Sequence, residues 1–133
     1  MTTTAVRFER YMSDGPGYVG AVEVVIGAGE VRLRLDGHED QVCSLRPPDG
    51  LRITGWRQAT STDCEALWPY LNQAEKEHAE APMFIEHERL AWLDLEGGGV
   101  GAVMLVGEPC CVRFFDLRKK AGGDDARAVW EFG

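Results

Sequence analysis

The sequence is short of basic residues and of long hydrophobic runs. It has 14 Lys and Arg against 22 Asp and Glu, a formal net charge of −8 over 133 residues. Phosphate binding needs clustered Lys and Arg, so we expect no direct binding to DNA or RNA. The longest apolar stretch, residues 100–106, is too short to span a membrane, and the first residues lack the apolar core of an export signal. We therefore expect a cytoplasmic protein without membrane association.

Specific catalytic and metal motifs are also missing. The sequence has no His-Glu-x-x-His motif. The cysteines lack the pair spacing of zinc sites: Cys43, Cys64, Cys110 and Cys111. In a cytoplasmic protein such thiols are expected to be reduced and mostly buried. A thiol nucleophile needs a base within hydrogen-bond reach, and no spacing in the sequence indicates one. We expect a non-catalytic protein with no cofactor and no metal.

What the sequence does contain is enough apolar material for one packed core. Hydrophobic residues make up 44% of the chain and charged residues 27%. The length is that of one ordinary domain, and no repeat or low-complexity tract divides it, so we expect a single domain over residues 1–133. Strand-like segments dominate. The predicted fold is α+β, with a largely antiparallel sheet of about seven to nine short strands and one main helix packed on it.

A β-hairpin is predicted over residues 18–35. Its second strand, residues 31–35, alternates strictly between apolar and polar side chains. In the register that places Ile26 opposite Val31, the apolar side chains share one face and Glu23 lies opposite Arg34 on the other. Apolar pattern and charge therefore favour the same register.

The helix is predicted over residues 62–80, with a kink near Pro69. Thr62 to Glu65 fits a capping box, and Pro69 lies too deep for an unbroken helix from that cap. The spacing predicts an inner face made of Leu67, Leu71 and Ala74, and a solvated face made of Gln73, Glu75, Lys76, Glu77 and Glu80.

After a short predicted strand at 83–86, the strands 90–96 and 100–106 are apolar on both faces. A turn made of Gly97 to Gly99 would place Leu93 opposite Val103. A strand pair buried on both faces needs a helix over one face and further cover over the other. That cover would be a second sheet, a partner or a second copy of the chain.

The negative charge is concentrated in one segment. Residues 62–96 hold nine acidic and two basic side chains, a net of −7, whereas the rest of the chain is nearly neutral. A negative face of this kind steers a basic partner at a high association rate. The residues expected to bind the partner are Glu75, Glu77, Glu80, Glu86 and Glu88, with Trp92 as an apolar anchor.

Size, acidity and the missing catalytic motifs together favour an inhibitor. We expect a small protein that docks on and blocks another macromolecule, as toxin-immunity proteins and phage anti-defence proteins do. Its partner would be a basic protein or the nucleic-acid-binding surface of a protein. The excess of Arg over Lys, with abundant Ala and Gly, favours a bacterial or phage origin.

Two alternatives remain open. Gly15 to Gly20 matches G-x-G-x-x-G, which would make the protein a small-ligand or nucleotide-binding module together with the loop Asp36 to Asp40. A β-branched run follows these glycines, whereas the dinucleotide motif opens a helix. The same acidic loop lacks the ligand spacing of a calcium site. The second alternative is a structural homo-oligomer, a homodimer in the simplest case, in which the doubly apolar strands pair across a symmetry axis.

Overall fold

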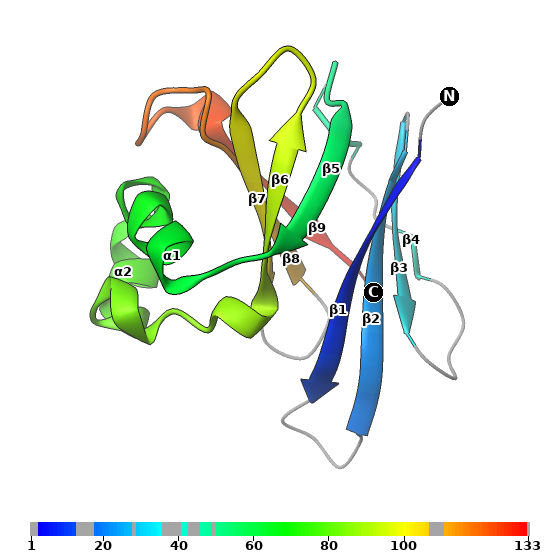
Figure 1. The fold of residues 1–133 in the computed structure, drawn as a ribbon, viewed down its shortest axis with the longest axis horizontal. Helices are drawn as coiled ribbons and strands as arrows, with labels where there is room; N and C mark the ends of the chain where they lie inside the picture. The colour runs from blue at the N-terminus through cyan, green and yellow to red at the C-terminus, as the bar shows by residue number, and fades with distance from the viewer. Residues whose placement is uncertain are drawn as a thin grey trace.

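The computed structural model describes residues 3–12, 18–27, 29–35, 41–42, 46–48, 50–106 and 111–132. Within these ranges the chain forms two antiparallel sheets, and short helices cover the outer face of one of them (Figure 1). The predicted α+β class is confirmed. No helix in the described ranges has the length and apolarity that crossing a membrane requires.

The first sheet has the order β1-β2-β3-β4, and β4 is a two-residue strand. The second has the order β5-β6-β7-β8-β9. The strands are β1 Thr4–Met12, β2 Tyr18–Gly27, β3 Glu30–Leu35, β4 Gln41–Val42, β5 Ile53–Gln58, β6 Leu90–Leu95, β7 Val100–Val106, β8 Cys111–Asp116 and β9 Arg127–Glu131. The helices are α1 Ser61–Leu67 and α2 Gln73–Ala79, and the 3-10 turns are η1 Trp68–Tyr70, η2 Pro82–Phe84, η3 His87–Arg89 and η4 Asp124–Ala126.

The structure has three layers, and this explains why β6 and β7 are apolar on both faces. Alternate residues of β6 and β7, such as Leu93 and Val103, pack against Val24 and other side chains of the first sheet. The residues between them, such as Trp92, pack with Leu67 and the rest of the helical segment. The second sheet is therefore the middle layer, between the first sheet and the helices (Figure 1). This arrangement follows from strands that bury both faces.

The N-terminal hairpin has the predicted register. Ile26 lies opposite Val31, and Glu23 lies opposite Arg34. The apolar side chains on one face of this hairpin, including Val22, Val24 and Leu33, pack against the second sheet and are fully buried. Local alternation and charge pairing were sufficient to fix this element.

The register predicted for the glycine hairpin is wrong by two residues. Leu93 lies opposite Gly101 rather than Val103. The Leu95 N–H donates to the Gly99 carbonyl at 3.2 Å, so the turn between them begins one residue earlier than the glycines do. Gly97, Gly98 and Gly99 all have positive φ, between 86° and 96°, which favours glycine at each position. A shift of two residues preserves which side chains share a face, so both faces are still apolar.

The predicted helix over 62–80 is divided into two short helices. The first is capped by Thr60, not by Thr62. The Asp63 N–H donates to the Thr60 hydroxyl, and the Thr60 N–H donates to the Asp63 carboxylate at 2.7 Å. Asp63 thus fills the place that the predicted box gave to a glutamate. Pro69 lies in η1, after which Leu71 is extended and Asn72 caps a new helix.

Trp92 and Trp130 are buried, whereas the exposed large apolar side chains lie on η2. Trp92, the expected anchor for a partner, is only 7% exposed and packs under α1 and η1. The predicted role of Trp92 as an exposed anchor is therefore wrong. Within the described ranges, the large hydrophobic side chains that are exposed are Met83 at 77% and Phe84 at 62%, both on η2.

We predict that the Trp92→Ala substitution lowers the free energy of unfolding by about 3–5 kcal/mol, because it leaves a cavity under the helices. The Phe84→Ala substitution is the control and should change it by less than about 0.5 kcal/mol, since this ring is largely solvated. Urea denaturation followed by circular dichroism measures both. Equal losses in the two variants would contradict the assignment of Trp92 to the core.

Candidate functional site

Glu75 is a buried ion-pair centre rather than a solvated residue. Its carboxylate accepts hydrogen bonds from Arg113 of β8 and from both terminal nitrogens of Arg127 of β9, at 2.6 and 2.9 Å for Arg127. It also accepts the Asn72 N–H at 2.7 Å, which completes the cap of α2. Burial alone would raise the pKa of Glu75, but the two arginines and the Asn72 N–H hold it below its ordinary value.

The prediction that Glu75 lies on a solvated helix face is therefore wrong. The residue is 9% exposed, and its charge is neutralised within the chain. The reason is the break at Leu71 and Asn72, which starts a new helix and makes Glu75 its third residue. Ala74, predicted to lie on the inner face, is exposed instead.

A second acidic residue of the segment is also neutralised from outside it. Asp63 accepts two hydrogen bonds from Arg57 of β5, at 2.6 and 3.0 Å. The Arg57 guanidinium, together with the hydrogen bonds from Thr60, holds the pKa of Asp63 below its ordinary value despite burial. Asp63 and Glu75 therefore join the helical layer to the second sheet.

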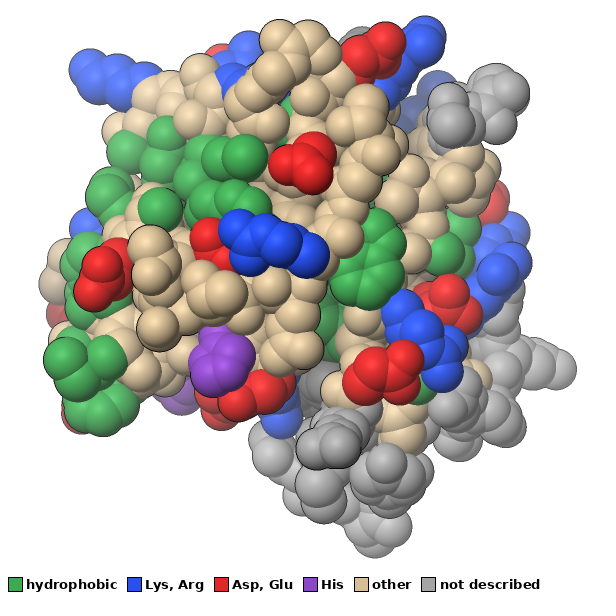
Figure 2. All heavy atoms as spheres, in the orientation of Figure 1, with side chains coloured by type: hydrophobic (Ala, Val, Ile, Leu, Met, Phe, Trp, Pro, Cys, Tyr) green, Lys and Arg blue, Asp and Glu red, His purple; other side chains and the backbone are tan. Residues whose placement is uncertain are grey.

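The remaining acidic side chains of the predicted face are exposed: Glu77, Glu80, Glu86 and Glu88. Glu86 pairs with Arg89 at 3.0 Å, and Glu88 lies 3.2 Å from the His87 imidazole. Glu80 ends α2 with a φ of 71°, and in the described ranges it has no ion-pair partner. Figure 2 shows hydrophobic and acidic groups close together on the helical side of the molecule.

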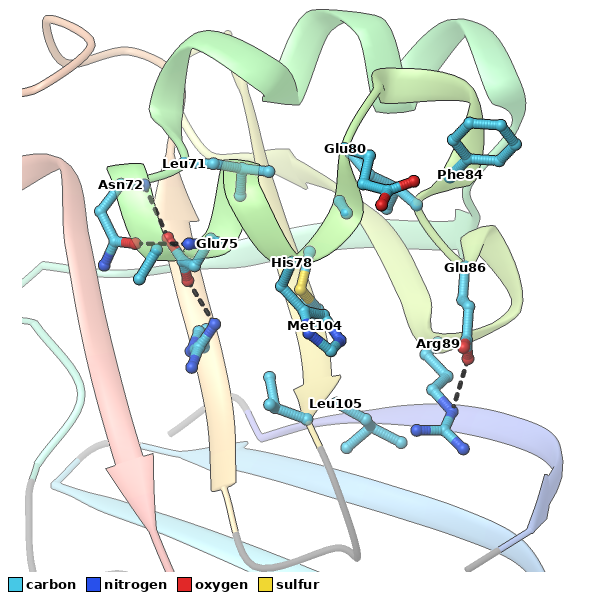
Figure 3. A pocket seen from close by; sticks show the side chains of 15 residues that line it. Leu71, Asn72, Glu75, His78, Glu80, Phe84, Glu86, Arg89, Met104 and Leu105 are labelled. Carbon is cyan, nitrogen blue, oxygen red and sulfur yellow. Dashed lines mark hydrogen bonds and ion pairs between the residues drawn. The ribbon is translucent and has the colours of Figure 1, made fainter. Parts of the chain in front are cut away.

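Two of these acids, Glu80 and Glu86, border a groove of about 680 Å³ between α2, η2 and the strands β7 and β8. We call this hollow the acidic groove. It is lined by Leu71, Asn72, Ala74, Glu75, His78, Ala79, Glu80, Phe84, Ile85, Glu86, Arg89, Met104, Leu105, Val106 and Arg113. Figure 3 shows Met104 and His78 near its centre, with Glu80 beside Phe84 at one end. Glu80 and Glu86 are the two predicted partner-binding residues that are both exposed and part of this lining.

Cys64 and Cys111 lie in the described residues, and both are free thiols. No group of three His, Cys, Asp or Glu side chains in the described residues is placed to hold a metal ion. Cys64 is buried, and this burial raises the pKa of its thiol, which keeps it in the protonated, unreactive form. Cys43, Cys110, Gly15 to Gly17 and the loop Asp36 to Asp40 lie outside the described residues.

Sequence reasoning missed Met83 and Phe84. The sequence predicts a short strand at 83–86, because a brief apolar run between polar residues is typical of one. Pro82 instead opens a 3-10 turn, and the N–H of Ile85 donates to the Pro82 carbonyl at 3.2 Å. The signal that could have identified them is an apolar pair directly after a proline and between glutamates, where no strand partner is available.

We predict that the Glu75→Gln substitution lowers the free energy of unfolding by about 2–3 kcal/mol, because it leaves two half-buried arginines without their counter-charge. The Glu77→Gln substitution in the same helix is the matched control, with an expected change below about 0.5 kcal/mol. Chemical denaturation of both variants gives the comparison. A Glu75→Gln variant as stable as the control would show that this cluster does not hold α2 to the sheet.

The stabilisation by Glu75 should also depend on pH. Because its pKa is lowered in the folded state, the ion pairs contribute fully above the pKa of the unfolded chain, and this contribution is lost as the pH falls through the folded pKa. The stability difference between wild type and Glu75→Gln should stay constant from about pH 7 to about pH 5 and shrink below about pH 4. Denaturation curves across this range test it. A difference that grows on acidification would contradict the assignment.

The chain matched no protein-family model, no curated protein and no solved structure in the comparisons.

Proposed function

We propose that this protein is a non-catalytic inhibitor that docks a basic partner protein over the acidic groove and thereby blocks it. One observation carries the proposal: Met83 and Phe84 are exposed on η2, beside a groove whose rim carries Glu80 and Glu86. Exposed apolar side chains ringed by charged ones are typical of protein interaction sites.

The charges of this surface indicate a basic partner. Glu77, Glu80, Glu86 and Glu88 are exposed on α2 and the turns after it. Arg89 offsets Glu86, whereas Arg113 is held by the buried Glu75. Such a face attracts a cationic surface during diffusional encounter and repels an acidic one.

Met83 and Phe84 supply the apolar contact area that gives affinity, which charges alone do not provide. Rim charges mainly set association rate and salt dependence, whereas desolvated apolar anchors give most of the affinity. Phe84, part of the groove lining, replaces Trp92 as the candidate anchor. A basic protein, or the nucleic-acid-binding surface of a protein, would thus meet both steering charge and an apolar contact.

Toxin-immunity and phage anti-defence proteins remain the classes that this proposal favours, by analogy of size and charge. The proposal also includes a cytoplasmic site of action, which agrees with the free thiols of Cys64 and Cys111. The homo-oligomer alternative has less support, because the first sheet and the helices already cover both faces of β6 and β7.

The test compares two triple variants with the same change in net charge. The first carries Glu77→Gln, Glu80→Gln and Glu86→Gln. The control carries Glu9→Gln, Glu96→Gln and Glu131→Gln, three exposed acids on other parts of the chain. A partner captured by the wild type is purified, and its association rates are measured by surface plasmon resonance at several salt concentrations.

We predict that the first triple variant associates about tenfold more slowly and with a weaker salt dependence, whereas the control keeps most of the wild-type rate. Equal effects of the two triples would mean that only net charge matters. That result, or no effect of either triple, would contradict docking over the acidic groove.

A further inference from the structure

The lining of the acidic groove separates into an apolar floor and a charged rim. Met104 of β7 is half-buried, and Leu71 and Ala79 lie beside it between the helical segment and the sheet. A volume of about 680 Å³ is within the range of roughly 300–1,000 Å³ that is usual for ligand sites. The groove therefore has room for a bulky side chain together with the backbone that carries it.

The carboxylates of the rim are not equivalent. Glu75 is saturated by its arginines, and Glu86 already pairs with Arg89. Glu80 has no such partner in the part of the chain that the structure describes. An incoming cation can therefore pair with Glu80 without first displacing another cation.

Phe84 adds a second attraction for a cation at the same place. Its ring is 62% exposed, and Figure 3 shows the Glu80 side chain directed toward it. A guanidinium or ammonium group is attracted by a carboxylate and by the face of an aromatic ring. Carboxylate and ring together favour Arg or Lys over a neutral side chain.

We propose, on the basis of the proposed function above, that the acidic groove takes a segment of the partner in which a bulky aliphatic side chain is flanked by Arg or Lys. The aliphatic side chain packs on Met104 and Leu71, and the cation lies between Glu80 and Phe84. Charge complementarity selects this occupant over a second copy of the chain, because two chains of net charge −8 would bring their acidic rims together.

Three capped peptides serve as probes: Gly-Arg-Leu-Arg-Gly, Gly-Arg-Gly-Arg-Gly and Gly-Glu-Leu-Glu-Gly. Each is titrated into the full ¹⁵N-labelled chain and followed by NMR. The first peptide should bind in the millimolar range, since so short a segment supplies only about 4 kcal/mol. The other two should bind at least about fivefold more weakly, a factor that corresponds to about 1 kcal/mol. The amide signals that shift should include those of Glu80, Phe84 and Met104.

Single variants separate the two parts of the recognition. Glu80→Gln and Phe84→Ala should each weaken the first peptide about threefold or more, which corresponds to at least about 0.6 kcal/mol. Met104→Gln, which keeps the length of the side chain, should remove the advantage of leucine over glycine. Glu65→Gln, an exposed acid on α1, is the control and should leave binding unchanged.

Four results would overturn the inference: no saturable shifts with the first peptide, equal binding of the glycine peptide, shifts confined to other surfaces, or a dimer in light scattering that Phe84→Ala dissociates. The last would make a second copy the occupant. If the variant with Glu77→Gln, Glu80→Gln and Glu86→Gln associates more slowly with the partner but the peptides do not bind, the proposed function stands and only this inference fails. If the peptides bind in the groove but the same triple variant associates with the partner at the wild-type rate, the proposed function is the one that fails.

Discussion

The Glu75 cluster is the interaction on which the rest of the helical layer depends. One carboxylate caps α2 through Asn72 and pairs with arginines on two adjacent strands. Such a short helix has little stability of its own, so it needs tertiary contacts to persist. By fixing α2 against β8 and β9, the cluster also fixes the position of the turns that follow. The positions of Phe84 and the groove therefore depend on this ion-pair cluster.

The acidic segment combines two kinds of residue that composition cannot separate. Asp63 and Glu75 are neutralised by arginines from outside the segment, and they are structural. Glu77, Glu80, Glu86 and Glu88 are exposed, and Glu80 and Glu86 line the groove. The net charge of −7 in residues 62–96 thus overstates the field that an approaching partner meets. The negative charge that is not neutralised lies close to the exposed Met83 and Phe84. This localisation makes the surface more selective for a partner that combines positive charge with an apolar contact.

Local patterns were sufficient for part of the fold. Alternation and the Glu23–Arg34 pair gave the register of the first hairpin, and the two apolar faces of β6 and β7 correctly indicated cover on both sides. The glycine turn was misjudged because three consecutive glycines allow more than one loop closure. A shift of two residues does not change which side chains share a face, so the assignment of the two faces remained correct.

The site depended on information that is distant in the sequence. Arg113 lies 38 residues and Arg127 lies 52 residues from Glu75 along the chain, so no helical pattern could show that Glu75 is buried. The break at Leu71 and Asn72, which turns Glu75 inward, follows from a cap that periodicity alone did not reveal. Exposure of Phe84 likewise results from a 3-10 turn where a strand was expected.

The central claim is that the surface formed by α2, η2 and η3 meets the partner. Hydrogen–deuterium exchange of the chain, alone and bound to its basic partner, tests this most directly because it reports each segment separately. The account predicts slower exchange on binding at amides of residues 77–90 and at the groove side of β7, with little change in β1 to β3. Protection confined to β1 to β3, with residues 77–90 unchanged, would contradict it.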